Sequence, residues 1–298
     1  MTMPTHQHAQ AVILPTALGP VEYLEFGQGP VVVTIHGAMG GCDQSAILAD
    51  TVLSGNFRVI AISRPGYLGT PLASGASATQ QGDLFAALLD ALKVESASVI
   101  AVSGGGPCAI AFALRHPARC RALVLISTVA GKNTAAIPFS FHLMKLLCRL
   151  PFVASAMRKK ALQNFEQSVA RSFTHPATRV RLLADDEARR LFAALTASTC
   201  ERMNQRLAGT DNDIRVTQTT DYPLETIRVP TLIIHGDRDP LLDYASHAQS
   251  AARRIPGAEL LTLEDGEHAA IFSHRSLVRE RLTRFLDNEK LGNSPLNI

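Results

Sequence analysis

Three residues of types that work together in acyl transfer, Ser103, Asp239 and His268, each follow closely on an apolar run in this sequence. A serine hydroxyl is a poor nucleophile at neutral pH, and it needs a base to take its proton. Histidine can be that base when an acid fixes its tautomer and stabilises the imidazolium. The three residues are therefore candidate catalytic groups, provided that the fold brings them together.

Ser103 interrupts an apolar run, VIAV at residues 99–102, and three glycines follow it directly. This pattern predicts a buried strand, a very tight turn and the start of a helix. The two backbones nearly touch in such a turn, so small residues are needed two positions before and after its apex, and Ala101 and Gly105 supply them. A phosphate-binding loop is the main alternative, but the segment lacks the lysine of a P-loop and the third spaced glycine and later acid of a dinucleotide site.

The elements that must position these residues alternate regularly between residues 30 and 127. Runs such as VVVTI at residues 31–35 are typical of strands buried on both faces, and each link is long enough for a crossover helix. The alternation predicts an α/β fold whose central sheet is mostly parallel with helices on both faces. Two strand-like runs before it, at residues 11–14 and 21–26, predict a hairpin at the edge of the sheet. Ligands bind beyond the carboxyl ends of such strands, where Ser103 must lie.

Residues 132–223 break this alternation, because they show helical spacing and no strand-like runs. We therefore expect a core domain made of residues 1–131 and 224–298, with a helical cap inserted at residues 132–223. Basic residues between 139 and 160 also fit a helix on a membrane surface, although Pro151 breaks any long amphipathic helix there. Cap helices that pack on the core are the preferred interpretation.

Composition restricts the class of partner and the compartment. The chain has 298 residues and a net charge of +3 without blocks of like charge, so we expect a small-molecule substrate and no nucleic acid. No apolar run is long enough to span a membrane, and the first residues lack the features of a signal peptide. Five scattered cysteines favour reduced thiols and a cytoplasmic location. No metal-ligand spacing occurs, so we expect neither a metal nor a cofactor, and the oligomeric state, monomer or homodimer, stays open.

The motifs resemble those of the α/β-hydrolase superfamily over about residues 20–287. The matching segments are HGAMGG at 36–41, RPGY at 64–67, AVSGG at 101–105, GDRD at 236–239 and GEH at 266–268. The order serine, acid, histidine is that of the family. The resemblance implies an α/β-hydrolase fold with Ser103 as the nucleophile of a tight elbow and His268 as the base. It favours Asp239 over Asp237 as the acid, because the acid usually stands three residues after the glycine that ends its strand.

The resemblance also implies an oxyanion hole, which needs preorganised N–H donors. The Gly104 N–H lies next to the nucleophile and at a helix start, where N–H groups lack partners. The second donor should come from the loop after His36, with Ala38 preferred and Met39 as the alternative. Met39 is also a candidate substrate contact. We expect the RPGY loop at 64–67 to be structural, without a catalytic role.

The function that the resemblance implies is a serine hydrolase that cleaves a small to medium, largely apolar carboxylic ester through an acyl-enzyme. The same triad serves aminopeptidases, carbon–carbon bond hydrolases, perhydrolases and acyltransferases, and a ligand-binding receptor of the same fold could retain it. An aminopeptidase needs a carboxylate in the cap for the substrate amine. Asp185, Asp186 and Glu187 are candidates, although they fit a solvated helix face equally well.

Overall fold

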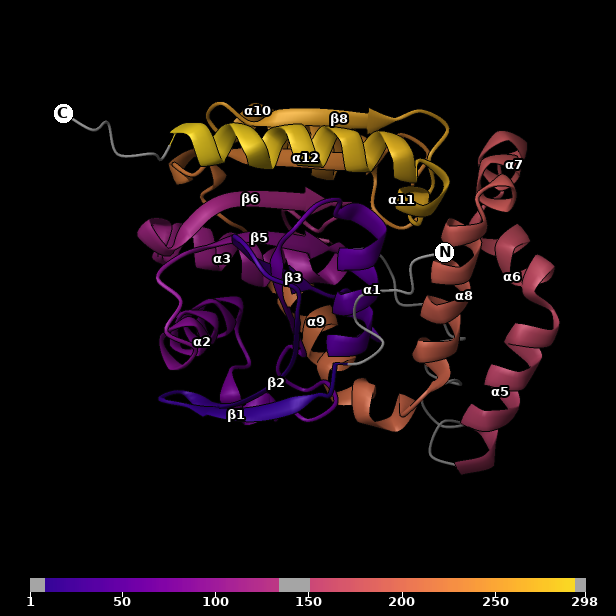
Figure 1. The fold of residues 1–298 in the computed structure, drawn as a ribbon, viewed down its shortest axis with the longest axis horizontal. Helices are drawn as coiled ribbons and strands as arrows, with labels where there is room; N and C mark the ends of the chain where they lie inside the picture. Colours follow the sequence, from indigo (N-terminus) through magenta and orange to yellow (C-terminus); the bar gives the residue numbers. More distant parts are fainter. Residues whose placement is uncertain (1–8, 134–150, 293–298) are drawn as a thin grey trace.

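The computed structural model describes residues 9–133 and 151–292, which build an eight-stranded sheet with helices on both faces (Figure 1). The strands lie in the order β1-β2-β4-β3-β5-β6-β7-β8. β1 and β2 form the predicted edge hairpin, β2 also pairs antiparallel with β4, and all other pairs are parallel. The mostly parallel sheet predicted from the sequence is thereby confirmed. The strand bounds are β1 Val12–Thr16, β2 Gly19–Phe26, β3 Val31–Ile35, β4 Arg58–Ile62, β5 Ala97–Val102, β6 Cys120–Ile126, β7 Thr231–Gly236 and β8 Glu259–Leu263.

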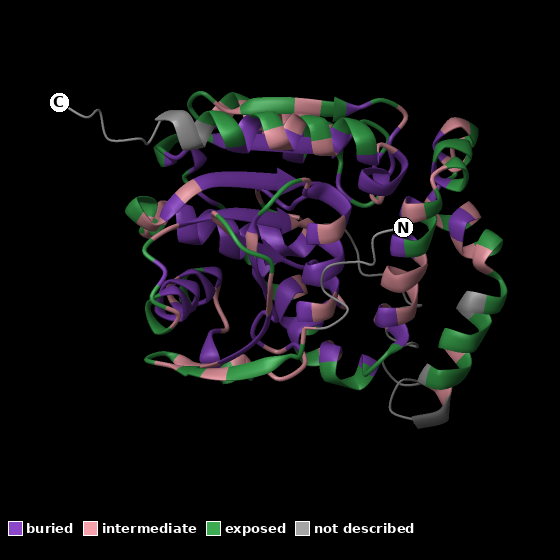
Figure 2. Cartoon of the chain, viewed as in Figure 1, coloured by how far each residue is buried: buried purple, intermediate pink, exposed green. Residues whose placement is uncertain are grey.

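Two helical layers bury the two faces of the sheet (Figure 2). Successive strand residues point to opposite faces, so Val33 of β3 packs in the cluster with α2 and α3, whereas Val32 packs in the cluster with α1 and α12. Strands covered in this way must be apolar on both sides, which explains their continuous apolar runs. The helices outside the segment between β6 and β7 are α1 Cys42–Val52, α2 Ala78–Ala91, α3 Gly106–Arg115, α10 Ser250–Arg254, α11 Ala270–Ser273 and α12 Arg275–Gly292.

The segment between β6 and β7, residues 127–230, is here called the insertion, and the rest of the described chain is called the core. The described helices of the insertion between residues 151 and 200 lie beyond the carboxyl ends of the strands (Figure 1), where Phe192 of the insertion packs edge-on against Phe272 of α11. The predicted division into a core and a cap at residues 132–223 stays a prediction, and the helical pattern at 141–147 lies outside the described residues. The helices of the insertion are α5 Pro151–Gln163, α6 Phe165–Ser172, α7 Pro176–Ala184, α8 Asp186–Cys200 and α9 Leu207–Thr219.

Local capping differs from what the sequence predicts at the start of α1. Asp43 is expected to be the N-cap, but the helix begins at Cys42 with Gly41 as its N-cap, and no side chain caps it. The Asp43 carboxylate instead pairs with the fully buried Arg206 of the insertion, at 2.5 Å. A charged guanidinium attracts this carboxylate more strongly than a neutral backbone N–H does, and the local sequence does not predict the pair.

Four of the five cysteines lie in the described part of the chain, namely Cys42, Cys108, Cys120 and Cys200, and all four are free and buried. Burial raises the pKa of the Cys42, Cys108 and Cys120 thiols to about 12, so these thiols stay protonated and unreactive at neutral pH. Across residues 9–133 and 151–292, no group of three or more histidine, cysteine or acidic side chains could hold a metal ion. Within the same ranges, no helix is long and apolar enough to cross a membrane.

Candidate active site

Ser103 stands at the apex of a sharp turn that joins β5 to α3 through the 3-10 turn Ser103–Gly105. Its φ of 53° lies in the left-handed region, which costs a residue with a side chain about 1–2 kcal/mol. The turn can close because Gly105 is small: a Cβ at this position would lie only 2.7 Å from the carbonyl oxygen of His36. The strained turn holds the serine hydroxyl at the carboxyl edge of the sheet, where strain is typical of functional residues.

Ser103 and Asp239 each lie within hydrogen-bonding distance of His268, although 165 residues separate the serine from the histidine. His268 Nδ1 is 2.7 Å from Asp239 Oδ2, and His268 Nε2 is 3.0 Å from Ser103 Oγ. The carboxylate can only accept, so Nδ1 carries the proton and Nε2 accepts from the serine hydroxyl. Asp237, the alternative acid, is exposed to solvent two residues away. This arrangement can take a proton from Ser103 and stabilise the resulting imidazolium.

The Asp239 carboxylate has hydrogen-bond partners in addition to His268. Its Oδ1 accepts the N–H groups of Leu241 and Leu242 at 2.8 and 3.1 Å, and its Oδ2 lies 3.2 Å from Nε2 of the buried His235. Burial alone would raise the pKa of Asp239, but the hydrogen bonds from His235 and His268 outweigh it and hold the pKa below its usual range. Asp239 is therefore ionised at neutral pH. The sequence predicts only a hydrogen-bonded strand histidine at position 235, because no local pattern shows that its ring turns toward this acid.

The backbone nitrogen of Ala38 lies close to Gly104, the residue after Ser103. A Cβ on Gly104 would be 3.4 Å from Ala38 N. The Met39 N–H, in contrast, already donates to Thr210 Oγ1 of α9 at 3.1 Å. The Met39 side chain packs against the Cys200 and Met203 cluster and is not among the residues that line the cavity next to Ser103.

A cavity of about 300 Å³ opens at Ser103 and His268 between the core and the insertion. Its walls are mostly apolar. Besides Ser103 and His268, the polar side chains of its described lining are His36 and the pair formed by Gln44 of α1 and Thr199 of α8, which are 3.0 Å apart. Among the described residues that line it, no side chain is acidic and none carries a permanent positive charge. The apolar side chains of the lining are Ile47, Leu48, Val102, Leu195, Leu241, Ile271 and Phe272, with Ala38 and Ala269.

The three acidic residues of the insertion that could bind a substrate amine lie elsewhere. Asp185 caps the start of α8 by accepting the N–H groups of Glu187 and Ala188, and Glu187 pairs with Arg275 of α12 at 2.5 Å. Asp186 is exposed and pairs with Arg189 one turn along the helix. These carboxylates stabilise α8 and its contact with the core, and none of them lines the cavity at Ser103.

Glu267, the residue before His268, is a buried carboxylate that ties the histidine loop to the insertion. It accepts the His175 N–H at 2.7 Å and the hydroxyls of Thr174 and Thr178 at 3.2 and 2.9 Å. All three donors lie just before or within the first turn of α7. Sequence reasoning missed Glu267, because its partners stand about 90 residues earlier in the chain.

Replacing Glu267 by glutamine is expected to lower the free energy of unfolding by about 1–3 kcal/mol, because an amide nitrogen cannot accept the donors that now meet a carboxylate oxygen. Urea denaturation at neutral pH measures the change. Glu264→Gln, on the exposed part of the same loop, is the matched control and should stay within about 0.5 kcal/mol of the wild type. Equal unfolding midpoints for Glu267→Gln and the wild type would show that the contact does not hold the loop.

Comparisons with known proteins find similar chains and a similar fold. Residues 30–275 match the family described as the alpha/beta hydrolase fold. A pimeloyl-[acyl-carrier protein] methyl ester esterase from Aromatoleum aromaticum is 30% identical over 255 residues, which cover 82% of this chain and 93% of that protein. A 2-hydroxy-6-oxononadienedioate/2-hydroxy-6-oxononatrienedioate hydrolase from Cupriavidus pinatubonensis is 27% identical over 264 residues, with 86% of each chain covered.

A solved structure is also similar along nearly the whole chain. The alpha/beta hydrolase fold protein from Nakamurella multipartita superposes with a TM-score of 0.79 at 32% identity, covering 93% of this chain and 99% of that one. The family resemblance and the fold class predicted from the sequence are confirmed by these matches.

Proposed function

The chain belongs to the alpha/beta hydrolase fold family, and from this premise we propose that it is a serine hydrolase of small to medium, largely apolar carboxylic esters. One observation carries the proposal. Ser103 Oγ lies 3.0 Å from His268 Nε2, and His268 Nδ1 lies 2.7 Å from Asp239. Ser103 and His268 also line a mostly apolar cavity. The similar methyl ester esterase supports an ester as the substrate.

In the proposed reaction, Ser103 Oγ attacks the ester carbonyl carbon while His268 Nε2 takes the hydroxyl proton. The carbonyl oxygen becomes an oxyanion that accepts hydrogen bonds from the N–H groups of Gly104 and Ala38. The tetrahedral intermediate collapses, and the His268 imidazolium gives its proton to the leaving alcohol. A water molecule then attacks the acyl-enzyme by the same steps and releases the acid. The ionised Asp239 stabilises the imidazolium in both halves of the reaction.

The lining of the cavity argues for a neutral acyl group. Burying an unpaired carboxylate or ammonium in apolar surroundings is strongly unfavourable. The described lining offers no permanent positive charge for a second carboxylate and no carboxylate for an amine. A dioate, the substrate class in the name of the Cupriavidus relative, and an aminoacyl amide therefore both fit this cavity less well than a neutral ester does.

A substrate panel tests this proposal. Nitrophenyl esters of neutral acyl chains are expected to be hydrolysed with a kcat/KM at least about 100-fold above that of the same chains ending in a carboxylate or bearing an α-amino group. A fluorophosphonate probe should label the folded wild-type protein at Ser103. Faster turnover of the carboxylate-terminated esters or of aminoacyl amides would contradict the proposed substrate class. Folded protein that neither turns over any ester nor takes the label would contradict the hydrolase proposal itself and favour a ligand-binding receptor.

A further inference from the structure

The Ala38 N–H belongs to the Gly37–Ala38 peptide, and the carbonyl oxygen of this peptide is held by two side chains. His36 Nδ1 donates to Gly37 O at 2.6 Å, and Arg64 Nη2 donates to it at 3.1 Å. A trans peptide is planar, so its C=O and N–H point in opposite directions. The two donors therefore fix the direction of the Ala38 N–H. They also polarise the amide, which makes its N–H a stronger donor.

His36 can serve as a donor because it is neutral and in one tautomer. Its Nε2 accepts the backbone N–H of Arg64 at 3.0 Å, which leaves the proton on Nδ1, where it meets Gly37 O. Burial, reinforced by the nearby Arg64 charge, lowers the pKa of His36 well below its usual value. The histidine of the HGAMGG motif thus binds the carbonyl oxygen of the peptide whose nitrogen lies near Gly104.

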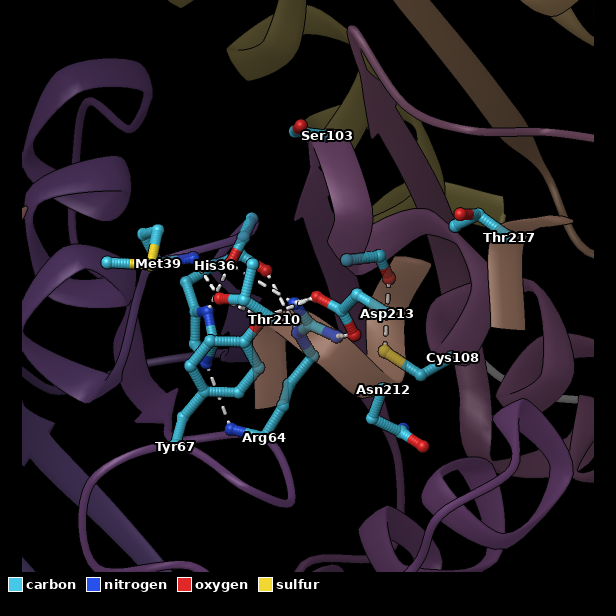
Figure 3. Close-up of polar contacts among 12 residues, drawn as sticks. His36, Met39, Arg64, Tyr67, Ser103, Cys108, Thr210, Asn212, Asp213 and Thr217 are labelled. Atoms are coloured by element: carbon cyan, nitrogen blue, oxygen red, sulfur yellow. Dashed lines mark hydrogen bonds and ion pairs between the residues drawn. The ribbon is translucent and has the colours of Figure 1, made fainter. Parts of the chain in front are cut away.

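Arg64 is in turn held by α9 of the insertion. Its guanidinium is almost completely buried and forms a two-pronged ion pair with Asp213, with N–O distances of 2.6 and 2.5 Å (Figure 3). Asp213 also accepts the Tyr67 hydroxyl at 2.5 Å, and Arg64 Nε donates to His36 O at 3.1 Å. A buried arginine charge needs such a partner, and this one comes from 149 residues further along the chain.

The same face of α9 holds the next peptide of the loop. Thr210 stands three residues before Asp213, so the two side chains project from one side of the helix. Thr210 Oγ1 accepts the Met39 N–H at 3.1 Å and donates to Arg206 O at 2.9 Å. The Gly209 N–H donates to Gly66 O at 2.9 Å and seats the start of α9 on the loop that carries Arg64. Both peptides that flank Ala38 are therefore fixed by contacts that lead to α9.

We propose that Thr210 and Asp213 are positioning residues for the oxyanion donor Ala38, with Arg64 as the link between Asp213 and Gly37 O. This inference rests on the proposed function, because an oxyanion forms only if Ser103 attacks a carbonyl. Ser103, Asp239 and His268 are carried by β5 and by the loops after β7 and β8. Displacement of α9 would therefore leave the triad in place and free the donor peptide to turn. The insertion then contributes to the rate as well as to the shape of the cavity.

The mildest test removes one hydroxyl. Thr210→Val keeps the shape of the side chain. It is expected to lower kcat about 3- to 10-fold and to leave KM within about twofold of the wild type. This loss of kcat is a fraction of the loss caused by removing a whole oxyanion donor. Thr217→Val on the same helix is the matched control, because that hydroxyl donates to Ile214 O at 3.1 Å and Thr217 lies apart from the cluster (Figure 3). The control should keep kcat within about twofold.

The stronger test neutralises the ion pair without leaving one charge alone. The double variant Arg64→Met/Asp213→Asn replaces the guanidinium by an apolar chain of similar length, a kind of exchange that buried ion pairs often tolerate. We expect kcat to fall about 10- to 100-fold with little change in KM. Arg275→Met/Glu187→Gln is the control, because it neutralises another pair between the insertion and the core, at 2.5 Å, away from the oxyanion loop. This control should keep its kcat even if its melting temperature falls.

A second readout separates positioning from general damage. A boronic acid forms a tetrahedral adduct with the serine and places an oxygen where the oxyanion would lie, whereas a carboxamide with the same side group does not. In Thr210→Val and in Arg64→Met/Asp213→Asn, affinity for the boronic acid should fall by about the same factor as kcat, and affinity for the amide should not change.

Three outcomes would overturn the proposal. Unchanged kcat and boronic acid affinity in Thr210→Val and in Arg64→Met/Asp213→Asn would show that these contacts only hold the insertion on the core. A parallel loss of amide affinity would indicate collapse of the cavity, and an equal loss in the control variants would indicate a general effect of destabilisation. Failure of the proposed function is distinguishable from all three, because the wild-type protein itself would then neither hydrolyse esters nor bind the boronic acid.

Discussion

Ser103→Ala is expected to lower kcat for a neutral nitrophenyl ester by about 10⁴- to 10⁶-fold, because no other group at the elbow can form the acyl-enzyme. The remaining donors and the cavity still bind the ester, so KM should change far less than kcat. Steady-state kinetics measures both constants, and the fluorophosphonate probe should no longer label the protein. A residual kcat within tenfold of the wild type would remove Ser103 from the mechanism.

Ser103→Gly is a useful companion, because it separates activity from stability. The left-handed φ of 53° at this position costs alanine about 1–2 kcal/mol, whereas glycine adopts it freely and loses about 0.4–1 kcal/mol through its more flexible unfolded chain. Both variants should be inactive, and the glycine variant should be up to about 1.6 kcal/mol more stable than the alanine variant in urea denaturation. A less stable glycine variant would show that the turn is not strained.

Asp239→Asn is expected to lower kcat by about 10⁴-fold, because an amide cannot stabilise the His268 imidazolium and favours the wrong tautomer of the ring. The matched control is Asp237→Asn, which changes an exposed carboxylate on the same loop. Its kcat should stay within about twofold of the wild type. The reverse result, with Asp237→Asn inactive and Asp239→Asn active, would assign the acid to the other aspartate.

The depressed pKa of Asp239 also predicts a pH dependence of stability. A carboxylate whose pKa is lower in the folded than in the unfolded state stabilises the fold in its ionised form. The contribution is complete above the unfolded-state pKa of about 3.9, and it is lost as the pH falls from there toward the lower folded-state pKa. Asp239→Asn should therefore be less stable than the wild type at pH 7, and the difference should shrink below about pH 4. A difference that does not shrink in acid would mean that the ionised carboxylate does not stabilise the fold.

The sheet and the candidate triad could be predicted from the sequence because their signals are local. Strands covered on both faces need continuous apolar runs, and the polar residues that stop those runs mark the carboxyl edge of a parallel sheet. Ser103 and His268 are recognisable as residues at such ends without knowledge of any contact. The preference for Asp239 over Asp237 came from the family resemblance, and the structure places Asp239 rather than Asp237 against the histidine ring.

The residues that support the site could not be found in this way, because their roles depend on partners far along the chain. Arg64 is predicted to belong to a structural loop, yet its guanidinium binds Gly37 O and Asp213 of the insertion. Glu267 meets its donors just before and within α7, and Asp43 pairs with Arg206 instead of capping α1. Each of these charges is buried or partly buried, so each requires a partner, but the identity of that partner follows only from packing.

By itself, the sequence determined the order of strands and helices in the core, the turn at Ser103 and the three residue types that stand at later strand ends. These features follow from periodicity and from the small residues that a tight turn needs, which act over a few positions. Only the tertiary structure decided that Met39 gives its N–H to Thr210, and that α9 reaches the peptide before Ala38 through Arg64. It also decided that the described lining of the cavity is mostly apolar and carries no permanent charge. The physical reason is that these properties come from side chains of the core and the insertion that meet only in the folded structure. Their spacing in the sequence does not predict that they are in contact.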